Sequence, residues 1–311
     1  MPGGSESAVA KRAHNAELAA AADEPVAKAA ARMLTARMSG VHDLALAAAE
    51  SRRDPESIHA LRVATRRAAA ALDAFAPLLP RRRSAWLHAR LQRLRRAAGD
   101  VRDLDVLLAG LHTGGRDAAP MGAVRAAIER RRRAAWKRLD EALRRVPGKK
   151  RWRRRVEKVV ERIGGARAST RFDRFAARRL AVTAREFFAA CAERAADLES
   201  LHRLRILGKK TRYAIEIFAP TAIESASRRS ALEQFERFQD LAGRCIDHAT
   251  AAACFTRLAR NGRVQTLKAS FERLATAEAK AAEGARKRAL AWVTPARIRA
   301  LEHDLVGRST G

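Results

Sequence analysis

Histidine and arginine recur in this chain in a short pattern that is present twice. His59 is followed three residues later by Arg62, and His202 is followed at the same spacing by Arg205. An imidazole can donate a hydrogen bond to an anion, and the planar fork of an arginine pairs with two phosphate oxygens at once. The offset of 143 residues between positions 59 and 202 far exceeds a solenoid repeat of roughly 20–50 residues. We therefore predict two duplicated halves, each with one anion-binding segment.

Each copy is predicted to be a helix with a basic face and an apolar face, because residues advance by about 100° along a helix. The basic faces carry His59, Arg62 and Arg66 in the first copy, and His202, Arg205, Lys209 and Arg212 in the second. The apolar faces carry Leu61, Ala64, Ala68, Leu72 and Phe75 in the first copy, and Leu204, Leu207, Ile215 and Phe218 in the second. Arg67 and Lys210 lie at the edges of the basic faces. Asp73 and Glu216 fall within them and are predicted to hold arginines in position.

The basic faces carry charges of almost one sign over three turns. Like charges one turn apart repel by a few tenths of a kcal/mol per pair, so we expect an anion to bind between them. The alternative is an ordinary charged face that contacts only solvent. That explanation suffices for one copy, but it does not explain why the histidine and the basic positions repeat in register.

The whole chain is strongly basic, with 64 Lys and Arg against 34 Asp and Glu and a net charge of +30. Such an excess repels itself in a compact chain and indicates a polyanionic partner, which could be nucleic acid, an anionic membrane or a phosphate polymer. No apolar run reaches the roughly 18 residues of a transmembrane helix. Cys191, Cys245 and Cys254 show no metal-binding spacing. We therefore expect a cytoplasmic protein without a membrane partner.

The two copies resemble the signatures of the CHAD family, the conserved histidine α-helical domains. The matching residues are His59, Arg62, Val63, Arg66, Arg67, Leu72 and Phe75, followed by His202, Arg205, Ile206, Lys209, Lys210, Arg212 and Tyr213. Ala69 stands where the family usually has another arginine. The resemblance implies a stand-alone domain of two four-helix bundles whose signature helices line a basic central channel. It further implies that the channel binds inorganic polyphosphate without catalysis and that the protein associates with polyphosphate granules.

A second pair of similar segments supports the duplication. Gly99 and Asp103 occupy the same relative positions as Gly243 and Asp247, and this spacing resembles a second CHAD motif. We expect each glycine to mark a helix break or a close contact between helices. Each aspartate is predicted to cap a helix or to form an ion pair that holds an arginine.

The remaining sequence predicts an all-α fold, since it is rich in alanine and no stretch alternates with period two. We expect two four-helix bundles related by a pseudo-twofold axis, and no β-sheet. The predicted single domain spans residues 23–306, with halves at 23–147 and 148–306 that meet near Pro147. Residues 1–22 and 307–311 are expected to be terminal tails.

The pattern Glu-x-x-His, at Glu56 and Glu199, is also found in di-iron bundles, which need two further glutamates. Here an arginine follows each histidine by one turn and would repel a dication, while each glutamate suits the first turn of a helix. His42-Asp43 lacks partners that would complete a metal-dependent phosphohydrolase site. We therefore predict no metal site.

Nucleophile elbows, P-loops and Rossmann glycine patterns are absent from the sequence, so we expect no enzyme and no cofactor. Non-specific nucleic-acid binding remains the alternative function, because phosphate contacts alone provide affinity to any basic surface. The basic faces lack interleaved aromatic residues for base stacking, and neither copy resembles a helix-turn-helix or a zinc finger. The sequence therefore favours polyphosphate as the ligand.

Overall fold

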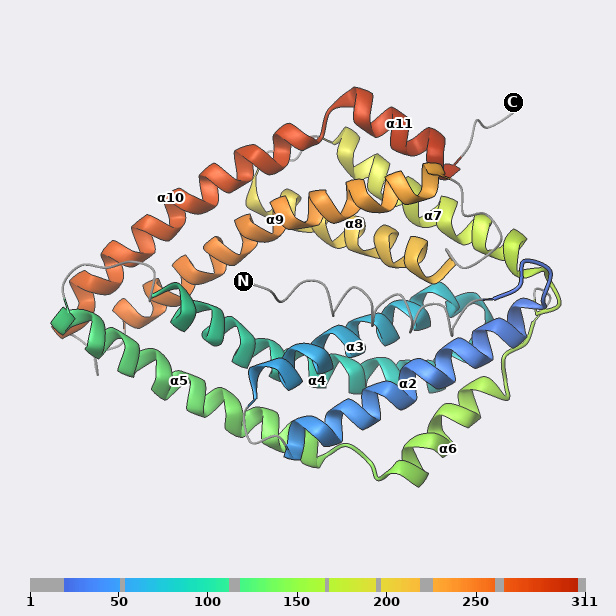
Figure 1. Cartoon of the computed structure of the whole chain (residues 1–311), viewed down its shortest axis with the longest axis horizontal. Coiled ribbons are helices and arrows are strands. Elements are labelled where there is room, and N and C mark those ends of the chain that lie inside the picture. The colour runs from blue at the N-terminus through green and yellow to red at the C-terminus, as the bar shows by residue number, and fades with distance from the viewer. Residues whose placement is uncertain are drawn as a thin grey trace.

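The computed structural model describes residues 20–50, 54–111, 118–165, 168–193, 197–218, 226–260 and 266–306, and all regular structure within these ranges is helical (Figure 1). The α-helices are α2 (Val26–Glu50), α3 (Pro55–Ala74), α4 (Arg81–Gly110), α5 (Ala118–Arg144), α6 (Lys149–Val160), α7 (Phe172–Ala192), α8 (Leu198–Phe218), α9 (Ala226–Ala259), α10 (Lys268–Trp292) and α11 (Pro295–Val306). A short 3-10 helix, η1, spans Ala76–Leu78. The predicted all-α fold is confirmed.

The helices form two groups that meet along α3 and α8. In the first group α2 packs against α3, α3 against α4, and α4 against α5. In the second group α7 packs against α8, α8 against α9, and α9 against α10, while α11 covers α7 and α9. Figure 1 shows the first group in the lower half of the view and the second in the upper half. The two groups are consistent with the predicted duplication, which itself remains a prediction.

Helix α6 was expected to open the second half, but it packs against α2 and α4 of the first group. Its buried Trp152 donates a hydrogen bond from Nε1 to the carbonyl oxygen of Met38 at 2.9 Å. Val156 and Val159 are buried beside it. The turn at Pro147 therefore returns the chain onto the first group.

Aromatic side chains join the two groups at the C-terminal ends of α3 and α8. The ring centroids of Phe75 and Phe218 lie 5.9 Å apart in an edge-on arrangement, and Phe175 of α7 stacks on Phe75 at 6.1 Å. Aromatic pairs at these distances each contribute about 0.5–1.5 kcal/mol beyond the burial of their area. This cluster fixes the C-terminal ends of the two signature helices relative to each other.

The segments that lead into α2 and α7 also pair. The backbone N–H of Val26 donates to the carbonyl oxygen of Thr170, and that of Phe172 donates to Glu24, both at 2.9 Å. An isolated β-bridge joins Pro25 and Arg171. The first described residue, Ala20, falls within the predicted N-terminal tail, yet it is only 3% exposed. Residues 1–19 and the predicted tail 307–311 lie outside the described residues.

Among the described residues, no helix is both long and apolar enough to span a membrane.

Candidate functional site

Helices α3 and α8 begin with the same N-terminal cap. The Asp54 carboxylate accepts hydrogen bonds from the backbone N–H groups of Glu56 at 3.2 Å and Ser57 at 2.8 Å. The Asp197 carboxylate accepts one from the backbone N–H of Ser200 at 2.8 Å. A cap of this kind stabilises a helix by about 1 kcal/mol. These two caps fix where each signature helix starts.

The basic side chains of the two helices come together where α3 packs against α8. The surroundings of Lys209 in α8 show this arrangement, because its ammonium group is largely buried and lies near several other cations. Burial is the largest cause that lowers the pKa of Lys209 to about 7, and neighbouring positive charges add to it. These charges are Arg205 and Arg212 of α8, and Arg66 and Arg62 of α3. Five of the predicted binding residues therefore form one cluster, which we call the central basic site.

Tyr213 links the two helices within the central basic site. The guanidinium carbon of Arg66 lies 5.5 Å from the centre of the Tyr213 ring, and that of Arg212 lies 4.7 Å from it. Cation–π contacts at these distances are worth about 0.5–2 kcal/mol. The ring thus holds one arginine from each signature helix. The buried Nε atoms of Arg66 and Arg205 have no hydrogen-bond partner within the described part of the chain.

Arg62 lies against helix α4 at Gly99. A Cβ atom added to Gly99 would lie 2.7 Å from Nη1 of Arg62, so a larger residue at this position would displace the end of that flexible side chain. Helix α4 runs unbroken through Gly99, so of the two roles expected for this glycine the close contact is the one found. Gly243, its counterpart in α9, has open space around it.

The two aspartates of the second motif lie near the arginines at longer range. Burial lowers the pKa of Arg62, and the carboxylates of Asp103 and Asp247 oppose that change. Asp247 acts in the same direction on Arg205. Burial and the nearby charge of Asp247 raise the pKa of Asp103, although Arg62 opposes them. The sequence predicts that each aspartate caps a helix or forms an ion pair. Within the described ranges, both lie inside a helix and neither forms a direct ion pair.

Glu216 forms a buried ion pair at the inner end of the central basic site. Its Oε1 lies 3.0 Å from Nη1 of Arg212, one turn earlier in α8, and the two side chains are 7% and 12% exposed. Glu236 of α9 also contacts Arg212 at 3.3 Å. Glu216 therefore holds an arginine in position, as expected from its place in the basic stripe.

Asp73 has a different environment. Its side chain is 62% exposed, and Oδ1 lies 3.4 Å from Nε2 of His88 in α4. The structure thus places Asp73 beside a histidine and not beside an arginine of the predicted set.

The two histidines lie at the outer, exposed ends of the basic faces. Partial desolvation is the main cause that lowers the pKa of His59, and it is opposed by Glu56. The charges of Arg102, Arg66 and Arg62 lower it further. This shift favours the neutral imidazole in the unbound protein, whereas a polyanion bound close to His59 would raise its pKa and favour the imidazolium.

Arg67 and Lys210 have charged neighbours on other helices. Lys210 Nζ lies 3.9 Å from Oε2 of Glu186 in α7. Arg67 acts electrostatically on Arg37 of α2. Their edge positions on the helices place them beside the neighbouring helices α7 and α2.

The profile of the CHAD domain family matches residues 38–256 of the chain. The protein belongs to the CHAD domain family. The fold is similar to that in the crystal structure of the CHAD domain from the plant Ricinus communis, with a TM-score of 0.66 and 25% identity over 92% of this chain and 93% of that one. It is also similar to PptA from Streptomyces chartreusis, with a TM-score of 0.61 and 20% identity over 86% of this chain and 99% of that one. A search of curated proteins found no match.

The CHAD domain places further charged residues around the central basic site that the sequence did not single out. Arg37 of α2 is 7% exposed, and burial is the main cause that lowers its pKa to about 10. Arg37 lies at the helical spacing of a core-facing stripe, between Leu34 and Val41. A charged residue in such an apolar stripe is the sequence feature that could have identified it. Arg102 of α4 lies near Arg62, but nothing in its local sequence distinguishes it from the other arginines of that helix.

The chemistry that this arrangement of the CHAD domain could support is multivalent anion binding. Guanidinium groups from two helices face one another, and the nearby carboxylates either hold an arginine or remain at longer range. Within the described residues, no group of three or more histidine, cysteine or acidic side chains is arranged to hold a metal ion.

Proposed function

We propose that this protein binds inorganic polyphosphate at the central basic site, without catalysing its hydrolysis. The observation that carries the proposal is the convergence of Arg62 and Arg66 of α3 with Arg205, Lys209 and Arg212 of α8. So many cations repel one another unless an anion lies between them. A linear phosphate polymer supplies closely spaced negative charges and pairs with arginine forks.

The alternative ligand is nucleic acid, which any basic protein binds to some degree. Base recognition in single strands relies on stacking against exposed aromatic rings. Tyr213 is the one tyrosine of the chain, and its ring is buried between Arg66 and Arg212. This arrangement favours a ligand that offers phosphate without bases.

A double substitution tests the site. Replacing Arg62 and Arg205 by alanine removes one phosphate contact from each signature helix, and we expect the affinity for polyphosphate to fall at least about tenfold. Replacing Arg130 and Arg133, two exposed arginines of α5, removes the same charge elsewhere and is the matched control. Calorimetric titration measures both variants, and thermal melting checks that they remain folded. Equal affinities in the two variants would exclude the central basic site.

Competition separates the two ligands. Duplex DNA and single-stranded RNA are added to the polyphosphate complex at equal phosphate concentration and at several salt concentrations. We expect neither nucleic acid to displace polyphosphate, while the logarithm of the affinity falls steeply with the logarithm of the salt concentration because counterions are released. Equal competition by nucleic acid would make general polyanion binding the function.

We further propose that polyphosphate binding localises the protein to polyphosphate granules in the cytoplasm. A fluorescent fusion of the intact protein is expected to concentrate on the granules, and the Arg62→Ala, Arg205→Ala variant is expected to spread through the cell. An even distribution of the intact protein in cells that contain granules would contradict this proposal.

A further inference from the structure

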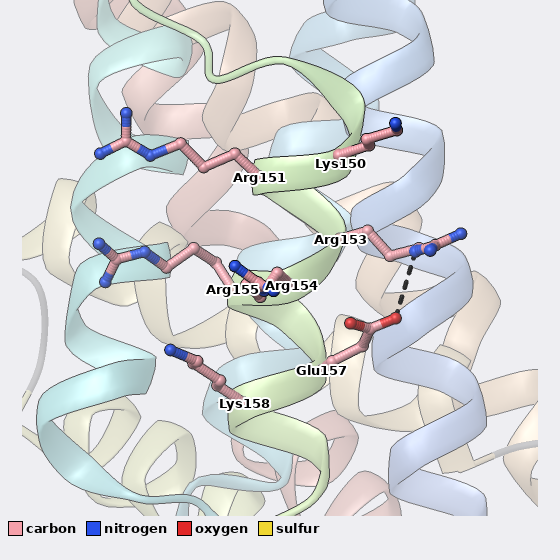
Figure 2. Close-up of a pocket in the computed structure, with 7 residues that line it drawn as sticks. All are labelled: Lys150, Arg151, Arg153, Arg154, Arg155, Glu157 and Lys158. Atoms are coloured by element: carbon pink, nitrogen blue, oxygen red, sulfur yellow. Dashed lines mark ion pairs between the residues drawn. The ribbon is translucent and has the colours of Figure 1, made fainter.

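Helix α6 presents a second, separate array of cations on the outside of the molecule. Its twelve residues include one acidic side chain, Glu157. The cationic residues are Lys149, Lys150, Arg151, Arg153, Arg154, Arg155 and Lys158. Figure 2 shows the last six with Glu157, splayed outward from the helix. We call Lys150, Arg151, Arg154, Arg155 and Lys158 the outer basic face.

The apolar side of α6 fixes the direction of this face. Trp152, Val156 and Val159 are buried, and the Trp152 ring lies 5.9 Å from His42 and 6.3 Å from Trp86. At about 100° per residue, the five cations of the outer basic face on the other side of the helix cover an arc of roughly 140°. Rotation of the helix would expose the tryptophan, so the outer basic face must point away from the core.

Helix α4 holds α6 from the side. Arg83 donates a hydrogen bond from Nη1 to the carbonyl oxygen of Lys158 at 3.0 Å. The guanidinium of Arg155 lies 5.0 Å from the centre of the Trp86 ring, and that of Arg90 lies 5.4 Å from it. Arg90 and Arg151 also act on each other electrostatically, so the positive surface continues from α6 onto α4.

The charges of the outer basic face are not neutralised by the protein. Glu157 pairs with Arg153 at 3.2 Å, and Asp43 lies 3.8 Å from Lys149. In the part of the chain that the structure describes, none of the five residues of the outer basic face forms an ion pair. Their side chains are exposed, so an external anion can reach them without any rearrangement.

The outer basic face is distant from the central basic site in the packing of the helices. Helices α2 and α4 each pack against both α3 and α6, so α6 lies on the far side of this pair from α3 (Figure 1). One short stretch of polymer in the central basic site therefore does not also cover α6.

We propose that the outer basic face is a second binding surface for polyphosphate, through which one protein molecule bridges two polymer strands. The inference rests on the proposed function, because it takes the same ligand. A convex helix fits a flexible polymer that can follow its arc, and arginine forks pair with phosphate oxygens. The one aromatic residue of α6, Trp152, is buried and offers no platform for bases. Two strands held by each molecule form a cross-linked network.

The test uses the full chain with Arg151, Arg154 and Lys158 replaced by alanine. These three side chains are exposed and do not anchor α6. The matched control removes two arginines and one lysine from the exposed surface of α5, at Arg130, Arg133 and Lys137. Light scattering with long-chain polyphosphate reports bridging, and calorimetry with a short polyphosphate reports the central basic site.

We expect the α6 variant to bind the short polymer within about twofold of the intact protein. With the long polymer it should scatter much less light than the intact protein, because its complexes are single strands without cross-links. With the long polymer, its salt slope is expected to fall by roughly 1 for each cation removed from the surface. The control is expected to scatter as the intact protein does. Equal scattering by the α6 variant and the control would overturn the second surface. So would a loss of duplex DNA binding in the α6 variant while polyphosphate is still cross-linked.

The Arg62→Ala, Arg205→Ala variant distinguishes the two proposals. If it binds the short polymer as tightly as the intact protein, the proposed function at the central basic site fails. Suppose instead that this variant loses affinity for the short polymer, while the α6 variant scatters light as strongly as the α5 control does. The proposed function then stands and the bridging surface is excluded.

Discussion

Helices α3 and α8 begin alike and end differently. Counted from their histidines, Arg212 and Glu216 of α8 correspond to Ala69 and Asp73 of α3. In α8 the arginine and the glutamate form a buried pair one turn apart, whereas in α3 the alanine offers no partner and Asp73 lies exposed beside His88. With the arginine present, the acidic residue lies buried in the central basic site, and without it the acidic residue lies at the surface.

The cation at the centre of each helix also differs. Arg66 of α3 corresponds to Lys209 of α8. An arginine stays charged in any protein, while a lysine loses its proton when it is buried among other cations. The ring of Tyr213, which only α8 provides, lies against Arg66. The two copies therefore supply different parts of one site.

Breaking the buried pair of α8 gives the largest expected effect on stability. Glu216→Gln leaves the buried Arg212 with the more exposed Glu236 alone, and we expect a loss of about 2 kcal/mol in the free energy of unfolding. Asp73→Asn is the control at the corresponding position of α3, and its effect should stay within about 0.5 kcal/mol. Urea unfolding monitored by circular dichroism measures both. Similar losses in the two variants would remove the difference between the helices.

The lysine of α8 should make ligand binding depend on pH. With a pKa of about 7, Lys209 is largely uncharged above neutral pH in the unbound protein. A bound polyanion favours the ammonium form, so binding takes up a proton, and the affinity falls as the pH rises through 7. We expect a decrease of roughly tenfold between about pH 6.5 and 8.5. Titration calorimetry in buffers of different ionisation enthalpy measures the proton uptake.

The control for this pH dependence gives α8 the residue type that α3 carries at the corresponding position, Arg66. Lys209→Arg keeps the charge at all these pH values, and we expect most of the decrease in affinity to disappear. The same lysine affects stability with a defined sign. Its pKa in the folded protein lies below the ordinary value of about 10.4, so the unfolded chain binds more protons between these values. The free energy of unfolding should therefore rise with pH across this window. If the polyphosphate affinity of Lys209→Arg falls with pH as that of the intact protein does, another titrating group causes the dependence.

The sequence predicts local features of the fold well. The helical class and the opposed apolar and basic faces follow from side-chain preferences and helical spacing. Pro147 marks a true turn, but a turn does not determine the direction of the next helix. Helix α6 packs against α2 because Trp152 donates a hydrogen bond to the Met38 carbonyl oxygen and packs beside Trp86. Both partners are distant from Trp152 in the sequence.

The prediction of the site was limited in the same way. Periodicity selected the face shared by Arg62 and Arg66, and it placed Arg67 at the edge of that face. It could not separate Asp73 from Glu216, because both fall at the same angle and only the partner one turn earlier distinguishes them. It could not foresee the pKa of Lys209 either, since that value depends on how closely α3 approaches α8.

The smallest expected effects concern the two glycines of the repeated motif. Gly99→Ala places a methyl group where Nη1 of Arg62 lies, while Gly243→Ala meets open space. Alanine in a helix interior is favoured over glycine by about 1 kcal/mol, so Gly243→Ala should stabilise the protein without changing polyphosphate affinity. In Gly99→Ala the end of the flexible Arg62 side chain moves, so the protein stays folded. We expect its affinity to fall by about threefold, which corresponds to less than 1 kcal/mol. Calorimetric titration and thermal melting of both variants measure these changes, and equal affinities would mean that the position of Arg62 against α4 does not matter for binding.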